Sequence, residues 1–564
     1  MTEQPPVKRR RTQRACDNCR QQRIRCDYDG VNQDDRPRKA RRHTTEEAED
    51  LAQGVEPGYL GRSSLVNLVF AHCYQKSWKR RLSELDHEHD LYRDAFREGE
   101  PESGCLVGRM VPIDPAHGGT SACTFGKASA KLADKIGAQT ILDDLLLKGR
   151  LHIIPFFPVV TVTESLGPQG PQEDYFRIWS VHNPDSAPPS AIPRVIRLIL
   201  CAIPSLSRDV PPNIRKSVLN TVQGLLTGPE MSRISSPTLS NVQVLILLSL
   251  ADELHAWDAR GAESMAWRRI GTGLRMALEL GLHRAVSSKV VPRPQRHRRQ
   301  RVWGACVFAD RWLSLRLGQP HTINLADADA PPPFPYPDHI DPAQSSTVVP
   351  SFQLFCELTR LSEFLGKACN LVCTPSWLER ADDVSLLLWQ NNFETWLEAL
   401  PTDWRYDLRC LTEASQVLNT LVVTVMFTFY QSLIWPIRPI PSHITFRPPQ
   451  RRKQDLIRRS QEVIIWAEGS GQFYIDTLSF IPYAVACCTL IQVKIYDETE
   501  SLSTLQWLDR GIAVLASWAD VETTNSQFRQ GRQNLVEMLK VLRPVDPPVL
   551  SDPFEIFGPE FQLE

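Results

Sequence analysis

The chain has 564 residues, of which 42% are hydrophobic and 23% are charged, and its formal net charge at pH 7 is −1. This composition is ordinary for a globular protein and excludes wholesale disorder, a collagen-like fibre and a small disulfide scaffold. The charge is unevenly distributed, because residues 1–42 carry 13 Lys and Arg against 6 Asp and Glu. Such a basic head predicts nucleic-acid binding or nuclear import. Fourteen scattered cysteines, behind an N-terminus without an apolar stretch, predict a reducing, intracellular compartment.

The first predicted element is a short cysteine-and-arginine segment. Cys16, Cys19 and Cys26 form a C-x2-C-x6-C pattern. Two thiolates in C-x2-C reach one metal ion, because the chain turns sharply there and a helix then begins. Arg20 and Arg23 lie three residues apart and project together from such a helix. Zinc would stabilise this cationic helix, which is too short to fold alone, and its arginines would meet phosphates and guanine edges.

A dense basic run precedes this segment and consists of Lys8, Arg9, Arg10 and Arg11. We expect an import receptor to bind this run, so the predicted location of the protein is the nucleus.

The segment RACDNCRQQRIRC, Arg14 to Cys26, resembles the first half of the fungal binuclear zinc-cluster DNA-binding domain. In that family six cysteines hold two zinc ions, and basic residues of the first half read a CGG triplet in the major groove of double-stranded DNA. The resemblance implies that the zinc ligands are Cys16, Cys19 and Cys26. It also implies that Gln22 and Arg23 occupy the positions that contact DNA bases. Arg20 and Arg25 would occupy the positions that contact DNA phosphates.

The second half of the family pattern is absent. Residues 27–45 contain no cysteine, and the next one is Cys73. Three thiolates cannot hold the binuclear cluster, although they could hold one zinc ion with a fourth ligand such as His43 or water. Two explanations stay open. Either a coding segment has been lost from the sequence, which we favour, or the DNA-binding head is degenerate.

The sequence as a whole predicts an all-α fold. It consists of a large helical regulatory domain, the small N-terminal zinc-cluster-like basic segment and flexible linkers. Apolar periodicity is helical from about residue 190, whereas strand-like runs such as Ile153–Val162 are isolated and predict no sheet. We expect Ser240 to cap one helix, and Gly281 and Gly318 to end two others. The predicted helices open at Pro193 and cover Asn241–Leu254, Glu263–Leu280, Val302–Leu317, Phe352–Cys373, Val384–Leu400, Leu411–Trp435, Arg452–Glu468, Tyr474–Tyr496 and Leu502–Leu542.

Two uncharged stretches, Ala414 to Ile437 and Thr477 to Val493, are long enough to raise the question of a membrane. The first contains eight Ser, Thr, Asn and Gln residues and the second contains Pro482, so we predict buried core helices and no membrane partner.

The body resembles the fungal-specific transcription-factor regulatory domain over roughly residues 190–345. The resemblance lies in LGLHR at 280–284, RRxRVW at 298–303, Asp310-Arg311 and LGxP at 317–320. The residues themselves favour structural roles. Predicted core positions are Trp303, Trp312, Leu313 and Leu317. Predicted ion pairs join Arg275, Arg299 and Arg311 to Asp310, Asp327 and Asp329. We expect Lys289 to Arg301 to form a solvated loop, with a second import signal as the alternative.

The predicted domains are the DNA-binding segment 1–43, a linker and poorly defined region 44–110, and the regulatory domain 111–345 with its core from about 190. Its C-terminal helical part follows at 346–543, and an acidic-hydrophobic tail at 544–564. This tail fits either an activation segment or a strap on the core.

The predicted function is sequence-specific, DNA-binding regulation of RNA polymerase II transcription for one pathway or gene cluster. Predicted partners are double-stranded DNA and the transcription machinery or co-regulators, and a homodimer stays open. The first alternative is a co-regulator with a degenerate DNA-binding head that acts through partner or effector binding. An enzyme with a pocket in the helical body is less favoured, because His117-Gly118-Gly119 is followed by no G-x-S-x-G and Cys369 and Cys373 fit core positions. We therefore predict that the chain is not an enzyme.

Overall fold

The computed structural model describes residues 139–161, 194–227, 237–255, 259–286, 293–336, 352–404, 413–522 and 526–543, together with short pieces between 57 and 72, at 106–109, at 234 and at 291. The chain divides after Val55, and every described residue belongs to the part that begins at Glu56. The predicted zinc-binding, DNA-binding and import residues therefore lie outside the described residues.

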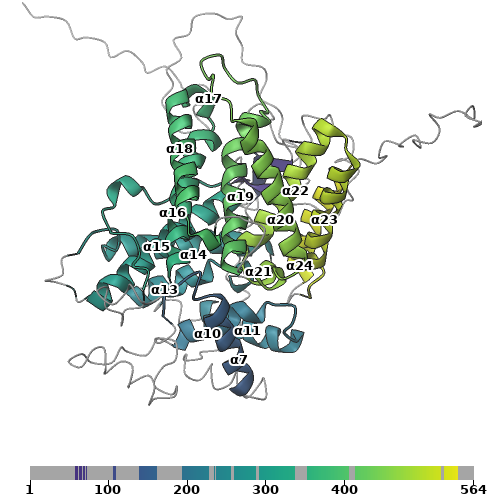
Figure 1. Ribbon diagram of the computed structural model, residues 1–564. Helices are drawn as coiled ribbons and strands as arrows, with labels where there is room; N and C mark the ends of the chain where they lie inside the picture. Colours follow the sequence, from purple (N-terminus) through teal and green to yellow (C-terminus); the bar gives the residue numbers. More distant parts are fainter. Residues whose placement is uncertain are drawn as a thin grey trace, which may run out of the picture. The chain divides into compact units, whose positions relative to one another are not determined.

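The described part is built from helices, which confirms the all-α prediction (Figure 1). In chain order they are α7 (Gln139–His152), α10 (Arg194–Ser205), α11 (Pro212–Thr227), α13 (Leu239–Leu248), η2 (Asp252–Leu254), α14 (Ala259–Glu279), α15 (Arg293–Leu317), η3 (Leu325–Asp327), α16 (Gln353–Ala368), the π-helical turn η5 (Cys369–Cys373), α17 (Trp377–Arg380), α18 (Asp383–Ala399), η6 (Thr402–Trp404), α19 (Glu413–Ile434), α20 (Gln450–Glu468), α21 (Gln472–Thr477), α22 (Phe480–Thr499), α23 (Leu502–Ala519) and α24 (Ser526–Val541).

One prediction about strands is wrong. β1 (Pro57–Leu60) pairs antiparallel with β2 (Leu106–Arg109), so a two-stranded sheet does form. Its two strands are four residues each and 45 residues apart in sequence, and so short a pairing leaves little periodicity to detect. The run Ile153–Val162 does remain outside any sheet over its described residues, where Ile153, Val159 and Val160 are buried.

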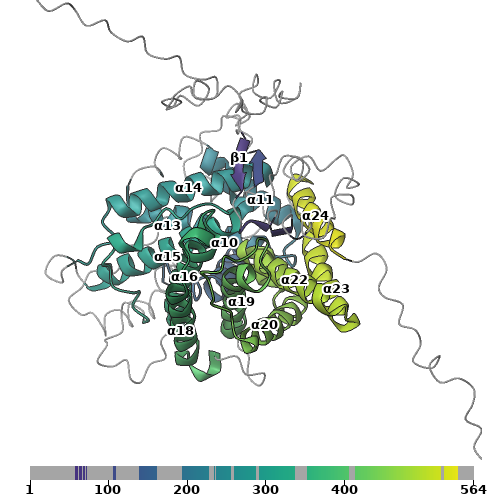
Figure 2. The same ribbon diagram turned by 90° about the horizontal axis from the view of Figure 1, so that it is seen from above.

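The helices α15 and α19 lie inside the bundle. α15 packs on α13, α14, α16 and α22, and α19 packs on α16, α20 and α22. α23 and α24 continue the stack beyond α22, and α7, α10 and α11 lie together at the lower side of Figure 1. Figure 2 shows the same order from above, with α14 and α15 on one side and α23 and α24 on the other. One continuous hydrophobic core therefore joins the segments on either side of residue 405.

Helix ends follow the expected chemistry at two glycines. Gly281 and Gly318 both have φ of 65°, a left-handed conformation that favours glycine after a helix. The predicted cap of α13 is wrong by two residues, because the Thr238 side chain, and not that of Ser240, accepts a hydrogen bond from the Asn241 N–H (3.2 Å). All residues from Val242 to Leu248 are buried. The sequence of α13 therefore lacks the alternation of polar and apolar residues from which the first residue of a helix can be predicted.

The predicted membrane candidates are core helices. α19 is long and apolar enough to span a membrane, but most of its residues are buried inside the bundle. The stretch around Pro482 lies in α22, which is also buried along most of its length. Both helices are apolar because other helices surround them.

Part of the region predicted as linker packs on α22. Val69 is fully buried, the Tyr483 hydroxyl donates to the Ser63 carbonyl (2.5 Å), and His72 Nε2 lies 3.4 Å from Asp497 Oδ2. The residues that follow the N-terminal segment are thus anchored to the body at these points.

Candidate functional site

No predicted zinc-binding, DNA-binding or import residue falls within the described part of the chain, which comprises the helical body. Among the described residues, no group of three or more His, Cys, Asp and Glu side chains could hold a metal ion. The zinc ligands Cys16, Cys19 and Cys26, like the DNA-contacting residues and the import run, therefore remain predictions from sequence.

The predicted Asp310-Arg311 pair forms a buried junction, but within α15 rather than between helices. Asp310 is 1% exposed and contacts Arg311, and it accepts hydrogen bonds from the backbone N–H groups of Thr322 (2.9 Å) and Ile323 (3.0 Å). Arg311 donates to the Ile323 carbonyl (2.8 Å). Burial raises the pKa of Asp310, while Arg311 and the two N–H groups oppose the rise. The pair holds the loop after α15 against the helix.

The other predicted ion pairs are only partly correct. Asp329 does pair, but with Arg284 (3.2 Å), and it also accepts from the Ala285 N–H (2.8 Å). Arg299 donates instead to the carbonyls of Leu280 (2.7 Å) and Gly281 (3.0 Å), and so caps the C-terminal end of α14. Arg275 is exposed, and the Asp327 carboxylate accepts from Asn324 (3.0 Å). The motif residues thus tie α14, α15 and the following loop together.

The expectation of a solvated loop from Lys289 to Arg301 is wrong for most of that run. Residues 293–301 are the first turns of α15. Arg301 is fully buried, donates to the Pro158 carbonyl (3.0 Å) and lies over the Phe352 ring. His297 stacks on Phe334 with ring centroids 4.1 Å apart. Because Arg301 is buried, an import receptor could not bind its side chain. This finding weakens the alternative prediction of a second import signal in this run.

The paired cysteines behave as structural residues. Cys369 and Cys373 begin and end η5 and are half-buried free thiols. A hydrogen bond with Cys373, together with burial, raises the pKa of Cys369 well above its ordinary value. A thiol held in its protonated form is a poor nucleophile and metal ligand, so this pair offers no active site.

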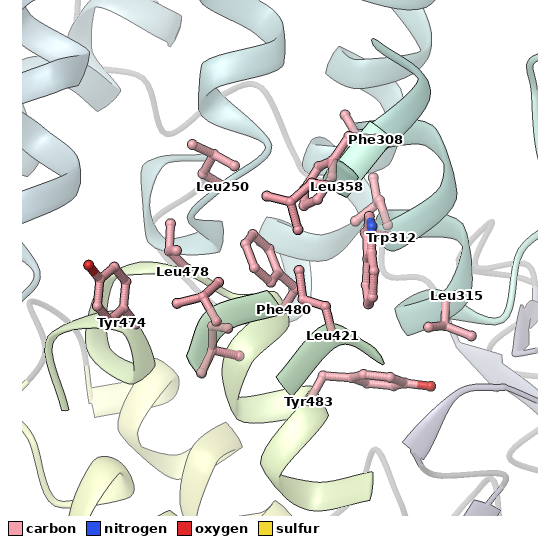
Figure 3. Close-up of a cluster of buried hydrophobic side chains, with 14 of the residues drawn as sticks. Leu250, Phe308, Trp312, Leu315, Leu358, Leu421, Tyr474, Leu478, Phe480 and Tyr483 are labelled. Carbon is pink, nitrogen blue, oxygen red and sulfur yellow. The ribbon is translucent and has the colours of Figure 1, made fainter. Parts of the chain in front are cut away.

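A small cavity lies where segments from distant parts of the chain meet, within the buried cluster of Figure 3. Its volume is about 10 Å³, the room of about one water molecule. Aliphatic and aromatic side chains line it almost completely. They are Ile153, Phe156, Phe157, Leu250, Phe308, Leu358, Val417, Leu421, Leu478 and Phe480.

One edge of this cavity is polar. His152, which lines the cavity, places Nδ1 3.4 Å from the Tyr474 hydroxyl and 3.7 Å from Glu413 Oε2. The Tyr474 hydroxyl donates to Glu413 Oε2 (2.9 Å). Burial, and then Glu413, raise the pKa of Tyr474, so it stays a neutral donor. The three side chains come from α7, α19 and α21, and no motif in the sequence connects them.

Polar side chains also lie between α19 and α20. Arg459 donates to Asn419 Oδ1 (2.8 Å) and Glu462 lies 3.3 Å from Arg458. Buried atoms without a hydrogen-bond partner from the protein include Gln416 Oε1, Asn419 Nδ2 and Glu462 Oε2. Burial raises the pKa of Glu462 to about 7. Ionisation of this carboxyl is therefore costly in the folded protein.

Comparison with known proteins places the matched region in the body. Residues 172–405 match the family described as fungal specific transcription factor domain. The chain is 30% identical over 199 residues to the acetamidase regulatory protein of Aspergillus oryzae, covering 35% of this chain and 23% of that protein. It is 40% identical over 92 residues to the acetamidase regulatory protein of Emericella nidulans, covering 16% and 11%.

A third relative is an uncharacterized transcriptional regulatory protein of Schizosaccharomyces pombe, 30% identical over 147 residues, which cover 26% of this chain and 18% of that protein. The matched part of the chain thus spans less than a quarter of each of these relatives. The matches support the fungal-specific transcription factor family that the sequence resembles. They indicate a transcription regulator and not an enzyme, in agreement with the prediction.

Proposed function

We propose that the protein is a nuclear, DNA-binding regulator of RNA polymerase II transcription that acts on one pathway or gene cluster. The observation that carries this proposal is the match of residues 172–405 to a transcription-factor domain in a chain that also has a C-x2-C-x6-C segment filled with arginines. The names of the relatives add support, since two of them are acetamidase regulatory proteins. The proposal therefore includes control of specific metabolic genes by this protein.

In this proposal, zinc organises the N-terminal segment. The donor set fits zinc, because C-x2-C thiolates are ordinary zinc ligands and a third thiolate follows at Cys26. Cys16, Cys19 and Cys26 would hold one ion, with His43 or water as the fourth ligand. Zinc supplies the free energy that keeps so short a segment folded. Gln22 and Arg23 would then face bases, and Arg20 and Arg25 would face phosphates.

A co-regulator with a degenerate DNA-binding head is the second candidate, favoured by the absence of the second cysteine triplet. The number of zinc ions per chain separates the two. One zinc per chain supports the proposal, and none supports the co-regulator. Two would mean that other residues complete a binuclear cluster.

DNA binding by the full chain tests the proposal. Fluorescence anisotropy would compare a CGG-containing duplex with a scrambled one over a salt series. We expect weak, salt-sensitive binding, and Arg23→Ala should reduce the preference for CGG by about 1–3 kcal/mol. Arg20→Ala should weaken binding to both duplexes and flatten the salt dependence. A salt-resistant, nanomolar complex of the unaltered chain would contradict the half-cluster, and equal binding of both duplexes would contradict specific recognition.

A further inference from the structure

An exposed apolar stripe lies on the first half of α18. Val384, Leu387 and Leu388 are 75, 48 and 58% exposed. Because they are three and four residues apart, they share one face of the helix, and the rings of Trp389 and Phe393 are buried on the opposite face. Elsewhere in the described part of the chain, exposed large apolar side chains occur singly or as one pair on α7. A cluster of this kind is typical of a contact surface.

The connection between α19 and α20 borders this stripe. Asp383, at the start of α18, accepts a hydrogen bond from the backbone N–H of Thr445 (2.9 Å). Further along α18, Glu394 lies 3.5 Å from Arg451. Asp383, Leu387 and Glu394 are spaced by four and seven residues, so they lie along the same side of the helix. The segment from Thr445 to Arg451 therefore follows one edge of the stripe.

The charge of this border is mainly positive. Arg447 is exposed and, within the described residues, donates to two backbone carbonyls and not to a carboxylate. Arg451 is 71% exposed, and its partner Glu394 is already in contact with Arg452. The carboxylate of Asp382 accepts a backbone N–H that begins α18 (2.8 Å). An apolar stripe with positive charge at its edge complements a segment that contains both large apolar and acidic residues.

The C-terminal tail of the chain has this composition. Residues 544–564 contain five acidic residues and neither Lys nor Arg. Large apolar residues alternate with the acidic ones, at Leu550, Phe554, Ile556, Phe557, Phe561 and Leu563. The tail therefore matches the stripe and its border in both respects.

The tail is also tethered within reach. Arg543, which precedes it, pairs with Asp509 of α23 (2.7 Å). From Asp509 to the start of α23 at Leu502 is about 10 Å along the helix. At the adjoining end of α22, Glu498 accepts a hydrogen bond from Trp435 (2.8 Å), which opens the connection that borders the stripe. The 21 residues of the tail span at most about 70 Å when extended, so the tail is long enough to cross this end of the bundle.

We propose that the tail docks on the stripe of α18 in the same chain, with Phe554 and Phe557 on the apolar side chains and its acidic residues against Arg447 and Arg451. Tethering gives the tail a high effective concentration, so weak contacts suffice. The tail then acts as a strap on the body. This docking does not depend on zinc or DNA binding by the N-terminal segment, so it stands or falls separately from the proposed function.

Photocrosslinking of the full chain tests the docking. A benzophenone amino acid replaces Phe554 in one variant and Phe557 in another, and mass spectrometry maps the products. We expect crosslinks to residues 383–399 and 435–452. Mixing chains labelled with ¹⁴N and ¹⁵N distinguishes a contact within one chain from a contact between two copies. The proposal would be overturned by crosslinks mainly to other surfaces, by crosslinks mainly between copies, or by the absence of crosslinks from both probes.

A matched pair of leucine variants tests the apolar contact. Leu388→Glu should lower the crosslinking yield about fivefold, because it places a charge on the apolar stripe. Leu151→Glu makes the same change at a side chain that is 60% exposed on α7, and should leave the yield unchanged. Equal losses in the two variants would contradict docking on α18.

A charge exchange tests the ionic contact. Replacement of Arg447 and Arg451 together by Glu should also lower the yield about fivefold. Replacement of Glu555 and Glu560 by Lys in the same chain should then restore it, because the charges attract again with reversed signs. The control replaces Arg284 and Arg360, both 57% exposed and away from α18 in the sequence, by Glu. A yield that neither exchange changes would refute recognition of the tail by its charge.

Discussion

The N-terminal cysteine-and-arginine segment and the helical body carry functional information in different ways. In the segment, residue types at fixed spacing predict a chemistry, since thiolates in this spacing are typical metal ligands and arginines typically contact phosphates. In the body, residues of the same types serve the fold. Arg301 is buried, Arg299 caps a helix, and Cys369 is held as a thiol. Within the described body, a charge or a cysteine is thus a poor guide to function, because packing of the core explains each of these three residues.

The largest expected effect lies in the N-terminal segment. Replacement of Lys8, Arg9, Arg10 and Arg11 together by Ala should abolish nuclear accumulation, measured by fluorescence microscopy of the tagged chain. The control is Arg296 and Arg298→Ala, in the half-buried basic run of α15, which should stay nuclear. If the localisation of the two variants is reversed, basic residues of the body and not of the segment act as the import signal.

In the body, the largest expected loss follows from Asp310→Ala. This change leaves the Arg311 guanidinium buried without its carboxylate and the loop N–H groups of Thr322 and Ile323 without an acceptor. Removal of one partner of a buried pair costs about 3–5 kcal/mol of unfolding free energy. The control Asp329→Ala breaks a pair whose partners are 57% and 52% exposed and should cost at most about 1 kcal/mol. Chemical denaturation measures both, and equal losses would contradict a structural role for Asp310-Arg311.

Core packing gives the next effect. Leu317 is 4% exposed at the end of α15, so Leu317→Ala should cost about 2–5 kcal/mol. Leu387→Ala removes the same atoms from a side chain that is 48% exposed on α18, and should change stability by about 0.5 kcal/mol or less. A small loss at Leu317 would refute the assignment of this end of α15 to the core.

The smallest effect depends on pH. Burial raises the pKa of Glu462 to about 7 from an ordinary value of 4.5. The folded state therefore binds more protons than the unfolded state between these values, and stability falls as the pH rises through this window. Glu462→Gln should remove the loss and stabilise the protein by about 1–2 kcal/mol at pH 8, with no gain near pH 4. An equal gain in stability at pH 4 and at pH 8 would contradict this account.

Much of the helical body could be predicted from the sequence. The predicted helix Glu263–Leu280, with its stop at Gly281, corresponds to α14, in which Ile270, Leu274 and Ala277 are buried. Trp303, Trp312, Leu313 and Leu317 are all buried, as predicted. Two long predicted helices correspond to two helices each, α21 with α22 and α23 with α24, because apolar periodicity continues from one helix into the next. α7 and α11 were not predicted, because polar residues interrupt the apolar face of each helix.

The cavity could not be predicted in the same way. His152, Glu413 and Tyr474 lie in three helices, at positions 261 and 61 residues apart along the chain. Each is an ordinary residue of its own helix, and only the tertiary fold brings the three side chains together. The Asp310-Arg311 pair could be predicted because its two residues are adjacent in the sequence. Its hydrogen-bond partners in the loop, Thr322 and Ile323, could not be predicted.

Occupancy of chromatin by the full chain tests the central claim most directly. Crosslinking and sequencing would compare the unaltered chain with a variant in which Cys16, Cys19 and Cys26 are Ser, after both are shown to accumulate in the nucleus. We expect the unaltered chain at a small set of promoters with CGG-type sites, and loss of this occupancy in the variant, because zinc is needed to fold the basic segment. Unchanged occupancy in the variant would contradict DNA binding through this segment and would show that partners bring the protein to its genes.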